Sequence, residues 1–250
     1  MRTANITVTH QGRTIHGQSF LPDKAGKYPV VLFSHGFNGS MNDSDYSAAH
    51  LCHNGIAAVN YTFCGGSDKD KSGFPTTEMS VLTEKEDLLA MLAWVQQQPE
   101  FDANNIFLFG GSMGGLVTIL AAEDCQKDVR GLVLLFPALC IPDDWRMRFP
   151  NEEDIPDTYV FWNFLLGRVH FDHIRQMDPF SYMPGIDLPV MILHGDKDPI
   201  VNVSYSQRAE KAFPHAELTI FPGEAHGFTA EANRKMDAMI TDFVKKHTCG

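Results

Sequence analysis

One serine near the middle of the sequence sits among glycines in a pattern that serves nucleophilic catalysis. Ser112 lies in FGGSMGGLVT, residues 109–118, at the end of an apolar run. Glycine loses more backbone freedom on folding than any other residue, so a cluster of glycines indicates a tight turn or a close approach of backbones. On a sharp turn between a strand and a helix, the serine hydroxyl projects from the edge of the sheet. The N–H groups at the start of that helix then face the place where an oxyanion develops.

Two later loops supply the partners that such a serine needs. A serine hydroxyl is a weak nucleophile until a base accepts its proton, and the base needs an acid that orients it. His226 lies in GEAHGF, residues 223–228, and is the predicted base. HGDKDPIV, residues 194–201, offers two acids, of which Asp198 is the predicted one because it lies further out in the loop. Asp196 is expected to bind backbone N–H groups of the turn, and its use as the acid is the alternative.

Two backbone N–H groups are predicted to hold the oxyanion of the tetrahedral intermediate. One belongs to Met113, the residue after the serine. The other belongs to Phe37 in SHGFNGS, residues 34–40, which follows the apolar run VVLF. His35 precedes Phe37 and is expected to brace this turn, with a second catalytic histidine as the alternative.

The elements that must position these residues alternate between strand and helix. Short β-branched apolar runs predict buried strands, and a 3.6-residue apolar period predicts helices. After an expected β-hairpin over residues 5–20, repeated alternation implies parallel strands joined by right-handed crossovers. The predicted fold class is therefore α/β, a doubly wound, mostly parallel sheet with helices on both faces. The expected strands are 28–36, 56–63, 106–110, 131–137, 188–195 and 216–223, and the expected helices are 44–54, 77–97, 113–123, 203–213 and 229–246.

One long segment breaks this alternation. Residues 138–187 are rich in aromatic side chains and too apolar for a linker. We expect an inserted cap over the carboxyl ends of the strands, where sheets of this kind bind ligands. Residues 1–137 and 188–250 then form the core domain. The cap aromatics singled out for contact with substrate, with packing inside the cap as the alternative, are Trp145, Phe161 and Trp162.

Composition argues against several other classes of protein. Apolar residues make up 44% of the 250, enough to bury a full core. The formal net charge of −11 repels phosphate backbones and anionic lipid, so neither nucleic acid nor a membrane is an expected partner. Five cysteines without a C-x-x-C pair argue against a disulfide framework or a zinc ribbon. With no visible signal peptide or membrane-length apolar run, the expected location is the cytoplasm.

Paired histidines do not amount to a predicted metal site. His50 and His53 have H-x-x-H spacing, and so do His170 and His173. Residues three apart can share one face of a helix. No carboxylate or third ligand joins either pair at a recognisable interval, so neither a metal nor another cofactor is expected.

Taken together, these motifs resemble the α/β-hydrolase superfamily. HGFNG, GGSMGG, HGDKDPIV and GEAHGF occur in the order and context of that superfamily, and they more specifically resemble the bacterial feruloyl or cinnamoyl esterases and their intracellular relatives. The resemblance implies an α/β-hydrolase fold, serine esterase activity and a homodimer. It also implies that Asp144, in FPALCIPDD, binds a phenolic hydroxyl of the substrate. His170 stands where the subfamily often has a tyrosine near the ring, and Met113 stands where it often has glutamine.

The expected reaction is the hydrolysis of a small-molecule carboxylic ester. Ser112 attacks the carbonyl, His226 moves the proton, and Asp198 holds the imidazole. The acyl group is expected to be short, or small and aromatic of the hydroxycinnamoyl type. One alternative keeps the triad and makes the chain a small serine peptidase or acyl-peptide hydrolase. The other is a hydrolase-fold protein that binds a ligand without catalysis.

Overall fold

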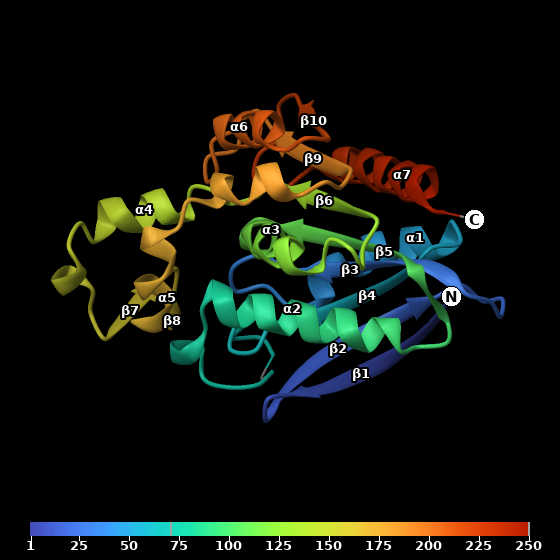
Figure 1. Cartoon of the computed structure of the whole chain (residues 1–250), viewed down its shortest axis with the longest axis horizontal. Helices are drawn as coiled ribbons and strands as arrows, with labels where there is room; N and C mark the ends of the chain where they lie inside the picture. The colour runs from blue at the N-terminus through green and yellow to red at the C-terminus, as the bar shows by residue number, and fades with distance from the viewer. Residues whose placement is uncertain (71, 250) are drawn as a thin grey trace.

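One large sheet organises the chain. The computed structural model describes residues 1–70 and 72–249, and within them this sheet has eight strands. The strands are β1 (Arg2–His10), β2 (Arg13–Leu21), β3 (Tyr28–Ser34), β4 (Ala57–Thr62), β5 (Phe101–Gly111), β6 (Gly131–Leu135), β9 (Val190–Gly195) and β10 (Ala216–Phe221). Their spatial order is β1-β2-β4-β3-β5-β6-β9-β10 (Figure 1). The pairs β1–β2 and β2–β4 are antiparallel, and the pairs from β4 to β10 are parallel.

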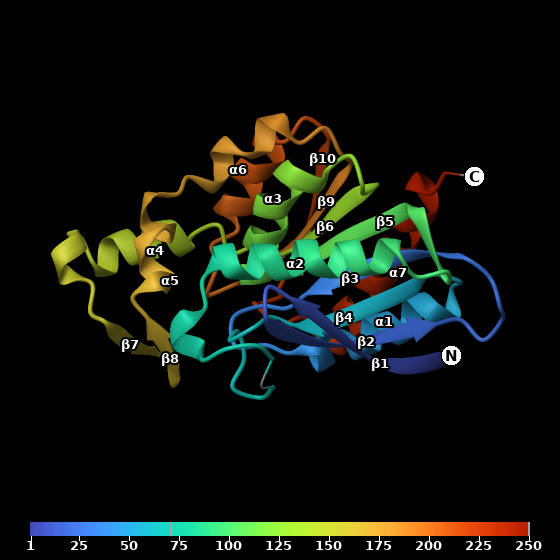
Figure 2. The same cartoon turned by 60° about the horizontal axis from the view of Figure 1, so that its bottom comes forward.

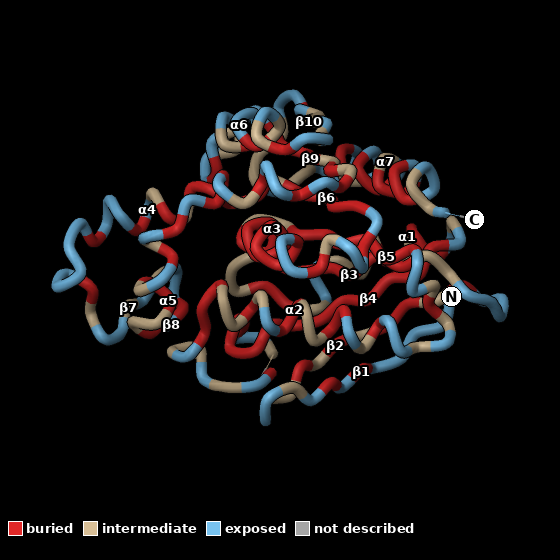
Figure 3. Tube along the Cα trace, in the orientation of Figure 1, coloured by how far each residue is buried: buried red, intermediate tan, exposed pale blue. Residues whose placement is uncertain are grey.

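Helices cover both faces of the sheet (Figures 1 and 2). The structure has α1 (Asp45–His53), α2 (Val81–Gln96), α3 (Met113–Cys125), α6 (Ser204–Ala212) and α7 (Ala230–His247) around it. Side chains of β3 alternate between the two faces: Val31 and Phe33 pack with α1 and α7, whereas Val30 and Leu32 pack with α2 and α3. Burial follows these layers, with the inner strands and α3 almost wholly enclosed (Figure 3). The predicted doubly wound, mostly parallel α/β sheet is confirmed.

The prediction was wrong about where the helix of residues 77–97 begins. That helix, α2, starts at Val81, and residues 76–78 form a separate single turn. Ser80 ends the extended approach, because its hydroxyl accepts the Thr83 N–H at 3.2 Å while the Thr83 hydroxyl accepts the Ser80 N–H at 2.9 Å. Reciprocal capping of this kind fixes the first turn of a helix more strongly than apolar periodicity does. None of the described helices is both long enough and apolar enough to cross a membrane.

Most of the 138–187 segment lies at the end of the molecule opposite both termini, and its last part runs back toward α3 and α6 (Figure 1). It contains α4 (Ile141–Arg148), the antiparallel hairpin of β7 (Thr158–Phe161) and β8 (Phe164–Gly167), and the short helix α5 (Val169–Asp172). Trp145 is buried against Phe171, with ring centroids 4.8 Å apart, so the segment has aromatic packing of its own. It also touches the rest of the chain, because the Thr76 hydroxyl donates to the Leu165 carbonyl at 2.6 Å.

Two buried carboxyl groups lie in the first turns of α2. Glu84 and Asp87 are both 0% exposed. Asp87 accepts the Cys64 N–H at 2.7 Å and lies 3.0 Å from Nε of Arg13. Neither oxygen of Glu84 has a hydrogen-bond partner among the described residues. Burial, and then repulsion by Asp87, raise the pKa of Glu84 well above its usual value.

Because Glu84 is buried, the free energy of unfolding should depend on pH. Because the folded chain holds the Glu84 proton more tightly than the unfolded chain, stability falls as pH rises above about 4.5, towards the folded-state pKa. Relative to the wild type, Glu84→Gln should gain up to about 1.4 kcal/mol in unfolding free energy per pH unit over that range. Urea unfolding at pH 5, 6, 7 and 8 measures this difference. Glu123→Gln, at an exposed site on α3, is the control; parallel profiles for wild type and Glu84→Gln would contradict the prediction.

Candidate active site

Ser112 occupies a strained turn between β5 and α3. Its φ of 52° and ψ of −120° lie in a region that side chains with a Cβ rarely adopt. Two hydrogen bonds of 2.9 Å pin the turn, one from the Ser112 N–H to the Leu135 carbonyl and one from the Ala138 N–H to the Ser112 carbonyl. Such strain persists only where the surroundings over-determine the backbone. The neighbouring strand β6 and the residues that follow it therefore hold the serine in place.

The glycines around Ser112 allow three backbones to meet there. A Cβ on Gly110 would lie 2.3 Å from the Gly114 carbonyl oxygen. A Cβ on Gly114 would lie 2.4 Å from the carbonyl oxygens of both Ser34 and His35, at the end of β3. Both distances are far below any van der Waals contact. The glycine cluster in the sequence is thus explained by close approach between β5, α3 and the end of β3.

Ser112, His226 and Asp198 lie in one hydrogen-bonded chain. Nε2 of His226 is 2.9 Å from Oγ of Ser112, and Nδ1 of His226 is 2.7 Å from Oδ2 of Asp198. A carboxylate can only accept, so Nδ1 carries the imidazole hydrogen and Nε2 is free to accept the serine proton. The three side chains come from the turns after β5, β9 and β10, which are neighbouring parts of one sheet edge. The arrangement can move a proton away from the serine hydroxyl.

Asp198 remains ionised in this arrangement. Its side chain is 0% exposed, and burial by itself would raise its pKa. The N–H groups of Val201 at 2.9 Å and Ile200 at 2.8 Å, together with His226, outweigh burial and hold the pKa of Asp198 below its usual value. Asp196 instead accepts the Gly223 N–H at 2.6 Å, so it fastens the turn after β9 to the turn after β10.

A second histidine, His194, contacts the same carboxylate. The sequence analysis assigned no role to this residue. His194 is fully buried, and its Nε2 lies 3.2 Å from Oδ2 of Asp198 and 3.0 Å from the Val201 carbonyl. Its Nδ1 lies 2.7 Å from the Ser206 hydroxyl. Two acceptors face Nε2, so the hydrogen belongs there, and Ser206 donates to Nδ1. The signal in the sequence is the spacing in HGDKD, which places this histidine four residues before Asp198.

One aromatic residue behind His226 also escaped the sequence analysis. Phe136 has a φ of 35°, and its ring centroid is 4.3 Å from that of His226. Its N–H donates to the Leu193 carbonyl at 2.7 Å. Nothing in the sequence distinguishes Phe136 from a residue that ends an ordinary core strand. The contact exists only because β6 and the turn after β10 are brought together.

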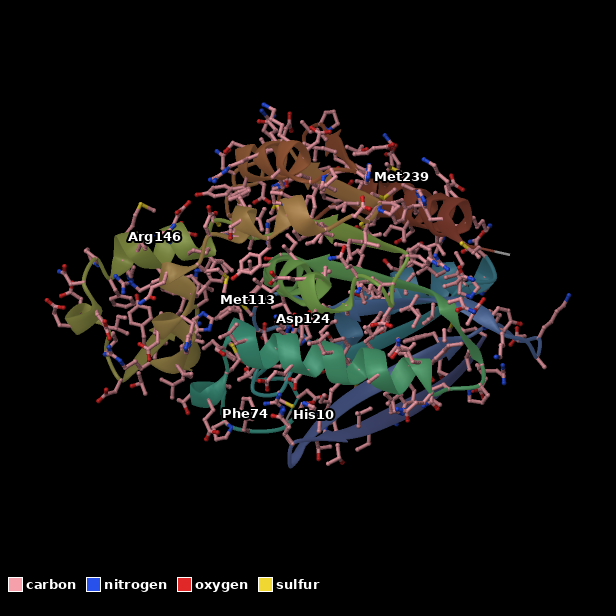
Figure 4. The ribbon with its side chains drawn as sticks, viewed as in Figure 1. His10, Phe74, Met113, Asp124, Arg146 and Met239 are labelled. Atoms are coloured by element: carbon pink, nitrogen blue, oxygen red, sulfur yellow. The ribbon has the colours of Figure 1, made fainter. Side chains whose placement is uncertain are left out.

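Phe37 and Met113, whose N–H groups are the predicted oxyanion donors, line one cavity together with Ser112. Neither the Phe37 N–H nor the Met113 N–H donates a hydrogen bond to another described residue. Met113 is the first residue of α3, where helix N–H groups have no partner within the helix, and Figure 4 shows it at the end of α3 that faces the 138–187 segment. Both groups are thus free to bind a ligand oxygen beside the serine.

His35 braces the turn that carries Phe37. Nε2 of His35 accepts the Phe63 N–H at 3.0 Å, and Nδ1 lies 2.7 Å from the Gly36 carbonyl, to which it donates. Burial lowers the pKa of His35 to about 4, so the ring is neutral at pH 7. Both ring nitrogens are already engaged, which leaves none for proton transfer with Ser112.

A cavity of about 370 Å³ opens from Ser112 toward the 138–187 segment. We call it the α4 cavity. The five residues predicted from the sequence to contact substrate all line it, although they come from α4, the hairpin tip and α5: Asp144, Trp145, Phe161, Trp162 and His170. Burial raises the pKa of Asp144 and lowers the pKa of His170 to about 4. Other lining residues were not predicted, among them Arg148, Cys140 and Ile200.

A second cavity, of about 660 Å³, opens from Ser112 on the other side. We call it the α1–α7 cavity, because residues 43–47 and 230–236 form two of its walls. Ser112, Phe37 and Trp162 line both cavities. The serine therefore stands where two hollows meet. The sequence analysis predicted the first hollow and missed the second.

The H-x-x-H pairs contribute to no metal site in the described parts of the chain. His170 lines the α4 cavity, and no group of three or more His, Cys, Asp or Glu side chains within residues 1–70 and 72–249 is arranged to hold a metal ion.

Comparisons with known proteins bear on this site. The sequence model of the family named serine aminopeptidase S33 matches residues 27–176. Dipeptidyl aminopeptidase BIII of Pseudoxanthomonas mexicana is 25% identical over 232 residues, which are 86% of this chain and 32% of that protein. The AB hydrolase superfamily protein YisY of Bacillus subtilis (strain 168) is 24% identical over 269 residues, which are 91% of this chain and 96% of that protein. This chain thus spans about a third of the length of the aminopeptidase.

Solved structures share the fold. Est1E from Butyrivibrio proteoclasticus with ferulic acid bound matches with a TM-score of 0.87 at 21% identity, covering 97% of this chain and 98% of that one. The eight-stranded sheet and its flanking helices are therefore those of an α/β-hydrolase.

His194 gives a testable prediction about the hydrogen-bonded chain. His194→Met keeps a similar volume but removes the N–H that faces Asp198 and the Val201 carbonyl, so the carboxylate that orients His226 is less firmly fixed. The rate at which a fluorophosphonate labels Ser112 should fall roughly three- to tenfold. His194→Gln, whose amide N–H can still reach Val201 and Asp198, should retain more of the rate. Equal losses in both variants would show that His194 only fills space.

Proposed function

The chain belongs to the serine aminopeptidase S33 family of hydrolases, and within that family we propose that it is a serine carboxylic-ester hydrolase. The observation that supports this proposal is the hydrogen-bonded chain Ser112–His226–Asp198, with 2.9 Å and 2.7 Å between its members. Ester hydrolysis needs a nucleophile, a base whose unprotonated nitrogen faces the nucleophile, and an acceptor that holds the base in that tautomer. Ser112, His226 and Asp198 are proposed for these three roles.

The proposed reaction has two halves. In the first, Oγ of Ser112 attacks the ester carbonyl carbon while Nε2 of His226 takes the hydroxyl proton, and the N–H groups of Phe37 and Met113 bind the oxyanion. The imidazolium then gives its proton to the leaving oxygen, and the C–O bond breaks to leave an acyl-enzyme. In the second half, water attacks the acyl group with His226 as base. Asp198 stabilises the imidazolium in both halves, and no step calls for a cofactor.

The α4 cavity is proposed to hold the acyl group, with the 138–187 segment acting as a cap over it. Its apolar wall of Trp145 and Phe161 suits a small aromatic or short aliphatic chain. The Asp144 carboxylate is a hydrogen-bond acceptor for the phenolic hydroxyl of a hydroxycinnamoyl group. The ferulic acid in the structure of Est1E, which shares the fold, is consistent with such an acyl group.

A peptidase is the second candidate, favoured by the family and by the dipeptidyl aminopeptidase relative. The same triad cleaves amides as well as esters. A panel of methyl ferulate, short p-nitrophenyl esters and aminoacyl p-nitroanilides discriminates the two. Turnover of the anilides with none of the esters would replace the proposal by the peptidase.

Variants of the triad test the chemistry directly. Ser112→Ala should abolish burst formation of an acyl-enzyme with p-nitrophenyl esters. Asp198→Asn should keep the fold but lower kcat about 10⁴-fold, because an amide can donate to Nδ1 of His226 and then stabilises the wrong tautomer. Stopped-flow release of p-nitrophenol measures both effects. A Ser112→Ala protein with near wild-type turnover would disprove the proposal.

Asp144 tests the acyl group. Asp144→Asn removes the charged acceptor and should lower kcat/KM for methyl ferulate, relative to methyl cinnamate, roughly tenfold. Asp143→Asn is the matched control, because Asp143 accepts the Tyr205 hydroxyl at 2.7 Å and does not line the cavity. An unchanged ratio in Asp144→Asn would remove hydroxycinnamoyl esters from the proposal while leaving ester hydrolysis intact.

A further inference from the structure

Two cavities meet at Ser112, and the catalytic groups are divided between them. Met113 lines the α4 cavity and not the α1–α7 cavity, whereas His226 lines the α1–α7 cavity and not the α4 cavity. An ester has two halves on either side of its carbonyl carbon. The distribution of the catalytic groups decides which half each cavity can hold.

The leaving oxygen must lie beside the residue that protonates it. In the proposed reaction, which this inference presupposes, His226 gives a proton to the alcohol as the C–O bond breaks. The alcohol half of the ester must therefore extend into the cavity that His226 lines. The acyl half then lies in the α4 cavity, against α4 and the hairpin tip.

We infer that the α1–α7 cavity is the leaving-group site and that Arg234 makes it select alcohols that carry a negatively charged group. The cavity is the larger of the two, at about 660 Å³ against about 370 Å³, so it has room for an alcohol half larger than the acyl half. Its walls combine an apolar part with polar side chains from α1 and α7. The apolar part includes Phe136 and Met236, and the polar side chains include Tyr46, Asn233 and Arg234.

Arg234 is an available positive charge on this wall. It is exposed on α7, and it forms no ion pair or side-chain hydrogen bond with any residue in the described parts of the chain. Asp43 lines the same cavity, but its two carboxylate oxygens accept the N–H of Ser40 at 3.1 Å and the hydroxyl of Ser40 at 3.3 Å. The guanidinium is therefore free to bind a carboxylate or phosphate, groups whose geometry it matches.

Matched esters test this assignment. All share one 3-phenylpropanoyl group, and their leaving alcohols are 4-carboxybenzyl, 4-phosphonobenzyl, the neutral 4-carbamoylbenzyl and the cationic 4-(aminomethyl)benzyl alcohol. Because the acyl-enzyme is common to all of them, kcat/KM compares only the steps up to release of the alcohol. The ratio of kcat/KM for an anionic ester to that for the neutral ester reports how the site treats the charge.

Substitutions at Arg234 should move this ratio. Arg234→Met is expected to lower it about threefold to fivefold, as for a partly exposed ion pair, and added salt should lower the wild-type ratio in the same direction. Arg234→Lys should keep most of the preference, and Arg234→Glu should shift it toward the cationic ester. A larger fall for the phosphonate than for the carboxylate assigns the site to phosphate-bearing alcohols, and the reverse assigns it to carboxylate-bearing ones.

Lys235→Gln is the matched control, because it removes the same charge from the next residue of α7 without lining either cavity. Its ratio should equal that of the wild type. A ratio in Arg234→Met within about 1.5-fold of wild type, or an equal fall in Lys235→Gln, overturns the inference. A carboxylate moved to the acyl half of the ester should be insensitive to Arg234; sensitivity there would overturn the assignment of the cavities.

Failure of this inference is distinct from failure of the proposed function. Ser112→Ala is measured with the same esters. If hydrolysis depends on Ser112 but the ratio ignores Arg234, only the leaving-group assignment fails. If the wild type hydrolyses none of these esters, or Ser112→Ala hydrolyses them equally well, the proposed function fails with it.

Discussion

The hydrogen bond of 2.7 Å between Nδ1 of His226 and Oδ2 of Asp198 is the contact on which the rest of the site depends. It fixes the imidazole hydrogen on Nδ1, and so leaves Nε2 as an acceptor facing Ser112 at 2.9 Å. A carboxylate enclosed in protein would lose its charge without compensating donors, because burial favours the protonated form. Two backbone N–H groups in the turn after β9 provide that compensation. The turn thus keeps the charge on which the imidazole orientation relies.

The sheet gives this contact its precision. β9 and β10 pair in parallel register, so the turns that leave them emerge side by side. Asp196 ties the two turns together through the Gly223 N–H. Asp198 and the Val201 carbonyl keep the ring hydrogen of His194 on Nε2, and the Ser206 hydroxyl donates to its Nδ1. On the opposite side, Phe136 supports the imidazole ring at 4.3 Å. Orientation of one histidine is therefore distributed over the ends of three strands and one helix.

Placing the nucleophile between two hollows has a chemical consequence. The α4 cavity borders Met113, the proposed oxyanion donor, and the α1–α7 cavity borders His226, the proposed proton donor. In the proposed reaction an ester bound across Ser112 has one productive orientation, because only one places the leaving oxygen near the imidazole. Such one-way binding lets two independent walls act on the two halves of a substrate, with a cap-like aromatic wall on one side and a mixed polar and apolar wall on the other.

Local patterns determined much of this protein. Apolar periodicity and the positions of glycines predicted the α/β class and most of the strands and helices. Local motifs singled out Ser112, Asp198 and His226, which the structure joins in one hydrogen-bonded chain. Tertiary structure alone decided the contact of Phe136 with His226, the division of Met113 and His226 between two cavities, and the wall built from α1 and α7. Those features join segments far apart in sequence, such as residues 43–47 and 230–236. No local sequence pattern indicates which distant side chains will line the same cavity, because that depends on how the helices pack against the sheet.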